Sequence, residues 1–240
     1  MMKEDDVVKS IRAMLEEAEA GVTDECCIYR VPFDIRKVNQ DAYNPKVVSI
    51  GPFHHKGNPR LQNMEKHKLI YCNAFLKRSN TKLENWISYI QDVEPRFRSC
   101  YSDALDFTKE QLVKIILVDS GFIFELFWGT YYEDYSGNSE SILLKPWLTT
   151  TVRLDLLLLE NQLPFFVLDH LFNQSMLSYA STSGGVNKKI PAFIEFTFDY
   201  FAFYNRSELK FQNVPIKHFT DLLRFFHLQH PLQSRIDKTV

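Results

Sequence analysis

The sequence predicts a mainly α-helical fold, a multi-helix globular bundle with a short extended segment near the N-terminus. Glycine is scarce, with 8 residues in 240, and phenylalanine is plentiful, with 20, which favours a packed helical body over a loop-rich or disordered chain. Apolar residues recur at helical spacing along most of the chain. Residues 154–168 carry apolar side chains in nearly every direction around a helix, which indicates an element buried on all sides.

The chain is expected to form one domain. Its 240 residues can bury a substantial core, and no repeat or strong linker divides them, so we predict a single helical domain over residues 1–240. The 28 lysines and arginines nearly balance the 30 aspartates and glutamates. The formal charge of -2 provides no global attraction for nucleic acid, and no nucleic-acid partner is expected.

A helix is predicted at the N-terminus. Asp5 or Asp6 can cap it, and it is expected to run to about Ala20, with Gly21 as its stop. Its apolar residues at helical spacing are Val7, Val8, Ile11, Met14 and Leu15.

Two extended segments are predicted after this helix. Residues 26–32 are partly β-branched and end at a proline, and residues 44–52 contain prolines near both ends. The two segments can pair as a small ribbon, whose length the prolines limit.

Helical periodicity returns after residue 60 and continues to near the C-terminus. Thr108 and Gln111 have capping-box spacing at the start of one of these helices. Loops are predicted over 131–140 and over 178–189, which is rich in serine, threonine and glycine. The helices are predicted over 61–76, 83–97, 112–126, 191–203 and 216–228, and another begins at residue 146 and leads into residues 154–168, the central run.

The central run breaks at Pro164, which cannot donate a backbone hydrogen bond and therefore begins a second helix or kinks a continuous one. Glu160, Asn161 and Gln162 lie at this break, where backbone groups lose their helical partners. We interpret these three residues and Pro164 as a structural motif in which at least two of the polar side chains are buried and hydrogen-bonded to backbone. A catalytic role for Glu160 is the alternative. The apolar residues expected to be buried on either side of the break are Leu158 and Phe166.

No catalytic, metal or cofactor site is assigned. His54, His55, Glu65 and His67 resemble a metal site, but adjacent histidines rarely bind one ion, and residues two apart on a helix point in different directions. The sequence has no HExxH motif, glycine-rich phosphate loop or GxSxG elbow. A nucleophilic pair made of a cysteine and a histidine distant in the sequence remains an alternative. The cysteines, which fit reduced and mostly buried thiols, are Cys26, Cys27, Cys72 and Cys100.

The segment 56–82 is locally basic, with Glu65 as its acidic residue. One interpretation is a surface for an anionic partner such as the cytoplasmic membrane leaflet, worth about 1 kcal/mol for each residue held near it. The favoured interpretation is an ordinary solvated helix face. The basic residues are Lys56, Arg60, Lys66, Lys68, Lys77, Arg78 and Lys82.

Four stretches together resemble the plant family of unknown function DUF 247, also called UPF 0481. The most recognisable of them is residues 155–166, which read DLLLLENQLPFF. The order and spacing of the stretches agree over most of the chain. The other stretches are 28–32, 43–55 with continuing matches to residue 78, and 122–127, with a weaker match over 218–224.

The resemblance implies a largely helical body that corresponds to the N-terminal part of the family region. Full-length relatives usually carry one membrane-spanning helix near the C-terminus; this chain ends at Val240, so it is expected to lack that anchor and to be cytoplasmic. We predict a non-enzymatic regulatory or recognition module with an unknown protein partner and, at most, a weak contact with the cytoplasmic membrane face. The alternative is an uncharacterised hydrolase or transferase that uses Glu160 or a Cys/His pair.

Overall fold

The computed structural model describes residues 4–21, 25–55, 59–133, 145–182, 190–211 and 215–228. These residues are mainly helical and form no β-sheet, so the predicted fold class is confirmed. The α-helices are α1 (Glu4–Gly21), α2 (Phe33–Arg36), α3 (Gln62–Ser79), α4 (Leu83–Ser99), α5 (Lys109–Tyr131), α6 (Pro146–Asp155), α7 (Phe165–Thr182), α8 (Phe193–Tyr200) and α9 (Phe219–Leu228), and the 3-10 helices are η1 (Gln40–Ala42), η2 (Pro59–Leu61) and η4 (Ala202–Tyr204).

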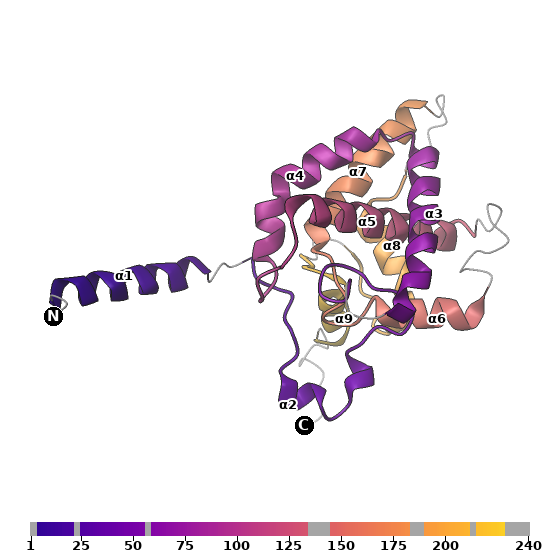
Figure 1. The fold of residues 1–240 in the computed structure, drawn as a ribbon. Helices are drawn as coiled ribbons and strands as arrows, with labels where there is room; N and C mark the ends of the chain where they lie inside the picture. The colour runs from indigo at the N-terminus through magenta and orange to yellow at the C-terminus, as the bar shows by residue number, and fades with distance from the viewer. Residues whose placement is uncertain are drawn as a thin grey trace, which may run out of the picture.

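Helix α5 lies in the middle of the body, and α3, α4, α7 and α8 pack against it (Figure 1). The predicted capping box begins it: Thr108 Oγ1 accepts a hydrogen bond from Gln111 N at 3.2 Å, and Gln111 Oε1 accepts one from Thr108 N at 3.0 Å. At Gly121 a Cβ atom would lie 2.4 Å from the Cys72 sulfur. Glycine at this position therefore allows α3 and α5 to approach closely.

An aromatic cluster joins these helices around Phe124 of α5. The Phe124 ring centroid lies 5.1 Å from that of Phe75 in α3 and 5.6 Å from that of Trp86 in α4. Its centroid distances to Phe172 in α7 and Phe193 in α8 are 5.4 and 5.2 Å. Because such edge-on and tilted pairs add to the free energy of burial, the cluster holds five helices to one core.

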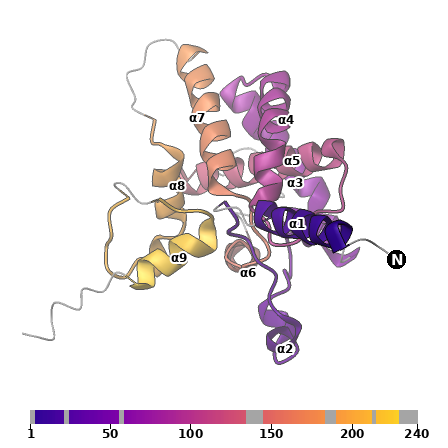
Figure 2. The ribbon, with the colours of Figure 1, turned by 90° about the vertical axis from the view of Figure 1, so that its left-hand side faces the viewer.

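Helix α1 is formed where it is predicted, but it stands apart from the body (Figures 1 and 2). Its apolar residues are consequently exposed, with exposed fractions between 42% and 65%. This helix presents an apolar face without burying it in the body. The residues of that face, which we call the α1 face, are Val7, Val8, Ile11, Met14 and Leu15.

The predicted ribbon between residues 26–32 and 44–52 is wrong. Ile28 instead forms an isolated parallel bridge with Tyr101, just after α4. Ile28 N donates to Cys100 O, and Ser102 N donates to Ile28 O, both at 2.9 Å. The N–H groups of the second segment are bound by side chains instead of a strand, as described below.

The central run is not one buried helix. Helix α6 ends at Asp155 and α7 begins at Phe165, so residues 156–164 between them are not α-helical. Leu158 and Phe166 are only partly buried, contrary to expectation. An irregular chain does not follow the helical period, so the periodic pattern does not decide which of its residues point inward.

The helical predictions in the rest of the chain are confirmed to within a few residues. The predicted loop over 178–189 is wrong for its first residues, because α7 continues to Thr182; the remainder lies outside the described residues. None of the described helices is long and apolar enough to cross a lipid bilayer.

Candidate functional site

Residues 46–51 have no regular secondary structure; they enter the interior at Val48 and have no neighbouring strand among the described residues. A buried backbone must still find partners for its N–H and C=O groups. Here the partners are side chains that come from α3, α5, the end of α6 and the loop after it. We call these four side chains the central brace. They are Lys68, Asp119, Asp155 and Asn161.

Asp155 ends α6 and points its carboxylate at three consecutive backbone donors. It accepts hydrogen bonds from Lys46 N at 3.0 Å, Val47 N at 2.7 Å and Val48 N at 2.9 Å. Burial raises the pKa of Asp155, and the three N–H donors oppose that rise. The carboxylate therefore fixes the first three residues of the segment 46–51.

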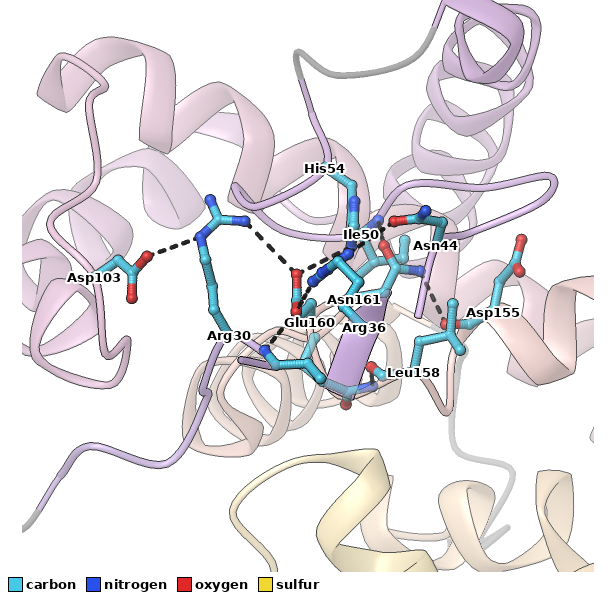
Figure 3. A network of polar contacts seen from close by, with 12 residues as sticks. Arg30, Arg36, Asn44, Ile50, His54, Asp103, Asp155, Leu158, Glu160 and Asn161 are labelled. Carbon is cyan, nitrogen blue, oxygen red and sulfur yellow. Dashed lines mark hydrogen bonds and ion pairs between the residues drawn. The ribbon is translucent and has the colours of Figure 1, made fainter. Parts of the chain in front are cut away.

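Asn161 binds the backbone of the same segment at Val48 and Ile50. Its Oδ1 accepts from Ile50 N at 2.7 Å, and its Nδ2 donates to Val48 O at 3.0 Å and to Asp155 O at 2.9 Å. A side-chain amide has the donor and the acceptor that a neighbouring strand would offer. Asn161 therefore replaces a strand partner (Figure 3).

Gln162 hydrogen-bonds to the loop between α6 and α7 and joins it to α9. Its Nε2 donates to Leu156 O at 2.7 Å and to Leu158 O at 2.8 Å, and its Oε1 accepts from Phe219 N at 2.9 Å at the start of α9. All three polar residues of the motif are buried, and each is hydrogen-bonded to backbone. Pro164 is also buried and directly precedes α7.

A buried ion pair completes the brace. Lys68 donates to Asp119 Oδ1 at 2.5 Å and to Ser49 O at 2.9 Å, and Glu65 lies 2.8 Å from the same ammonium. Asp119 Oδ2 accepts from Gly51 N at 2.8 Å. Burial disfavours the charge on Lys68, but the two carboxylates raise its pKa above the ordinary value.

Gly51 ends the segment in a conformation that requires glycine. Its φ is +73°, and a Cβ atom there would lie 2.3 Å from the carbonyl oxygen of Gln162. The same carbonyl accepts a hydrogen bond from the Tyr101 hydroxyl at 2.9 Å. The loop and the segment are thus in direct backbone contact.

Glu160 occupies a separate position beside the brace, among cations from the N-terminal part (Figure 3). Its Oε1 accepts from Val31 N at 2.6 Å and from the Arg36 guanidinium. Arg30 Nη1 lies 3.6 Å from Oε2, and this guanidinium also pairs with Asp103 at 2.8 Å. The Glu160 side chain is fully buried, so the arginines compensate a charge that would otherwise be very costly.

His54 faces the other oxygen of this carboxylate. His54 Nε2 lies 3.8 Å from Glu160 Oε2, and neither atom has a hydrogen-bond partner among the described residues. Burial lowers the pKa of His54 from 6.5 to about 4, so the imidazole is neutral near pH 7.

This pKa predicts a pH dependence of folding. Because the folded pKa is depressed, the unfolded chain takes up the proton first, and stability falls as the pH drops from about 6.5 toward 4. The variant H54Q keeps a polar side chain but does not titrate. Between about pH 7 and pH 4.5 we expect the wild type to lose about 2 kcal/mol more unfolding free energy than H54Q, measured by urea denaturation. Equal losses in the two proteins would show that His54 is solvated.

The geometry assigns Glu160 to bracing more readily than to catalysis. A general acid or base must reach a substrate, whereas the Glu160 side chain is fully buried and its Oε1 atom is held by Val31 N and Arg36. A cavity of about 440 Å³ lies between α3 and α5 beside His55 and Phe107, and Glu160 does not line it. Its carboxylates, Glu65 and Asp119, are already engaged by Lys68.

The basic segment is only partly a surface. Lys68 is wrongly included in the predicted anionic-surface set, because it is fully buried in its ion pair with Asp119. Arg78 is half-buried and pairs with Glu125 at 2.9 Å. Lys56 lies outside the described residues. The exposed members are Arg60, Lys66, Lys77 and Lys82.

Several members of the site are not identified by sequence reasoning. Asp119 carries a detectable signal, since it is a lone carboxylate within the apolar residues 115–124. Arg30 and Arg36 carry no local signal, because only the fold brings them to Glu160. No group of His, Cys, Asp and Glu able to hold a metal ion occurs in the part of the chain that the structure describes.

Comparisons with known proteins identify relatives in plants. A family model, DUF247, described as a plant protein of unknown function, matches residues 28–239. UPF0481 protein At3g47200 of Arabidopsis thaliana is 34% identical over 223 residues, which cover 90% of this chain and 44% of the relative. Putative UPF0481 protein At3g02645 of the same plant is 31% identical over 163 residues, covering 68% of this chain and 30% of the relative. The chain thus spans less than half the length of these relatives, and no solved structure matches it.

Proposed function

The chain belongs to the plant family DUF247, and from that premise we propose that it is a non-enzymatic recognition module that binds another protein through the α1 face. The observation that carries the proposal is the exposure of five apolar side chains on one side of a helix that stands apart from the body (Figure 1). A face of this kind is a common means of binding a hydrophobic groove.

The charge of α1 restricts the partner. The helix sequence contains Lys9 and Arg12 among a larger number of acidic residues, which are Glu4, Asp5, Asp6, Glu16, Glu17 and Glu19. Helices that lie on membranes usually carry lysine and arginine beside the apolar face, so this composition does not suit an anionic lipid surface. Two copies of such a helix would also repel each other. We therefore propose a protein groove that is apolar at its base and basic at its rim.

The enzyme alternative has weaker support. The Glu160 side chain is fully buried, and Val31 N and the Arg36 guanidinium both bind its Oε1 atom, so a substrate has little access to this carboxylate. His218 Nε2 lies 3.0 Å from the carbonyl oxygen of Cys27, a contact that positions backbone and does not activate a thiol.

We extend the proposal to location in the cytoplasm. The cysteines of the described residues are all free thiols, as is usual in a reducing compartment. With Lys68 buried, the exposed basic residues near α3 can add only about 1 kcal/mol each to membrane binding, and salt screens that attraction. We expect any sedimentation with phosphatidylserine vesicles to be lost at high salt; a salt-resistant pellet would contradict this.

The proposal is tested by photocrosslinking in plant cells. A photoreactive amino acid at Ile11 should crosslink a discrete protein, because Ile11 lies on the α1 face. The same probe at Lys9, on the opposite side of the helix, is the matched control and should not. In the Ile11-probe chain, Leu15→Glu should reduce the crosslink at least about tenfold, since a buried leucine contributes about 1.5–3 kcal/mol. Equal crosslinking from both sides, crosslinks to lipid, or crosslinks between copies of this chain would each overturn the proposal.

A further inference from the structure

Two cysteines that are far apart in the sequence lie side by side where the N-terminal segment meets the end of α4. The parallel bridge between Ile28 and Tyr101 sets the register and places Cys27 directly opposite Cys100. Cys27 N donates to Cys100 O at 2.9 Å, the side chains of the two cysteines are in contact, and the Cys100 thiol donates to Arg96 O at 3.3 Å. The two thiols therefore lie close to each other.

The pair borders a small cavity of about 180 Å³. Arg96 and Lys217 also line it, and the ring of Phe166 lies under the Arg96 guanidinium at 4.0 Å. Cys27 and Cys100 are 8% and 1% exposed. A cavity of this size admits a small oxidant and excludes a protein.

We propose that Cys27 and Cys100 form a reversible dithiol–disulfide site that a small hydroperoxide oxidises. A disulfide requires Cα atoms about 4.4–6.8 Å apart, and the hydrogen bond from Cys27 N to Cys100 O at 2.9 Å holds the two backbones close together. The site is independent of the α1 face and goes beyond the proposed function.

The two thiols are not equivalent. The side-chain contact with Cys100 lowers the pKa of Cys27, and the nearby Lys217 adds to this, whereas burial, Asp221 and Glu25 oppose it. The same contact and burial raise the pKa of Cys100. Cys27 is thus the thiol that forms the attacking thiolate.

The reaction balances with the hydroperoxide as the oxidant. The Cys27 thiolate attacks one peroxide oxygen, the O–O bond breaks, and Cys27 becomes a sulfenic acid while the departing oxygen takes up a proton as water or alcohol. Cys100 then attacks the Cys27 sulfur, the S–O bond breaks, and the hydroxyl leaves as water with the Cys100 proton. Two thiols are oxidised by two electrons, and one peroxide is reduced.

The disulfide would join the segment before α2 to the end of α4. It would also close a loop between residues 27 and 100, which restricts the unfolded chain. Oxidation is therefore expected to raise the melting temperature by several degrees, and a thiol reductant should reverse the rise.

The test uses the folded chain treated with hydrogen peroxide, alkylated in denaturant and mapped by mass spectrometry. We expect a Cys27–Cys100 disulfide to be the main product, removed by dithiothreitol. Cys72 is an internal reference that should stay reduced, since burial raises its pKa to about 12. A Cys26–Cys27 or intermolecular disulfide as the main product, or oxidation of Cys72 at the same rate, would overturn the proposal.

Variants provide the second measurement. C26S is the matched control and should give the same disulfide as the wild type. In C100S the sulfenic acid at Cys27 has no resolving thiol, so dimedone should label Cys27 several-fold more than in the wild type. Unchanged dimedone labelling in a C100S protein with a native circular dichroism spectrum would contradict the assignment of the two roles.

Discussion

Replacing Lys68 with methionine is expected to lower the free energy of unfolding by about 3–5 kcal/mol, measured by urea denaturation with circular dichroism. Methionine has nearly the length of lysine, so little packing is lost. The cost comes from Asp119, whose buried carboxylate loses its cation, and from the carbonyl of Ser49, which loses a donor. The ion pair between Lys68 and Asp119 also joins α3 to α5.

Two further variants identify the cause of this loss. Lys66 lies two residues away on the same helix and is exposed, so Lys66→Met should change stability by no more than about 0.5 kcal/mol. Adding Asp119→Asn to Lys68→Met should restore part of the stability, because the uncompensated charge is gone and the amide oxygen can still accept from Gly51 N. Purely additive losses would refute the ion-pair explanation.

Replacing Asp155 with alanine is expected to cost about 3 kcal/mol or more, because one buried and two partly buried backbone donors lose a charged acceptor at once and each such loss costs about 1–3 kcal/mol. The affected N–H groups belong to Lys46, Val47 and Val48. The amide hydrogens of these three residues should also exchange faster than in the wild type. A purely global loss of stability would instead speed exchange across the whole protein.

Asp103 provides the comparison for that variant. Its carboxylate also accepts a hydrogen bond, from the Arg30 guanidinium, but the Asp103 side chain is 45% exposed. Asp103→Ala should therefore cost less than about 1 kcal/mol. If the two alanine variants lose similar free energies, the bracing role of Asp155 is refuted.

The sequence predicts the helical body well because its period is strong where packing is regular. The helices around Phe75 and Phe124 have long amphipathic or apolar patterns, and Thr108 provides a local start signal. The polar triplet also stands out in the sequence, because charged and amide side chains interrupt an apolar run beside a proline.

The path of the central run is not predictable in the same way. Residues 156–164 look helical by periodicity, yet Gln162 gives better partners to the carbonyls of Leu156 and Leu158 in an irregular loop. That competition depends on α9, since Phe219 N is the third partner. A local pattern carries no information about a contact 57 positions away.

The segments predicted to be extended also depend on distant contacts that a local pattern does not reveal. Residues 44–52 have the composition of a strand, and a strand is normally expected to pair with another strand. Here Asp155 and Asn161 supply the acceptors and donors, and nothing in residues 44–52 indicates which distant side chains will do so.

The brace has a consequence for the order in which the chain folds during synthesis. Ile50 depends on Asn161, which is translated 111 positions later. At about 5–20 residues per second, a ribosome needs roughly 5–20 s to cover that interval, and longer before the residue leaves the exit tunnel. During this time the backbone groups that Asn161 binds, Ile50 N and Val48 O, lack their native partner. We expect the nascent N-terminal third to be the part of the protein that most depends on chaperones.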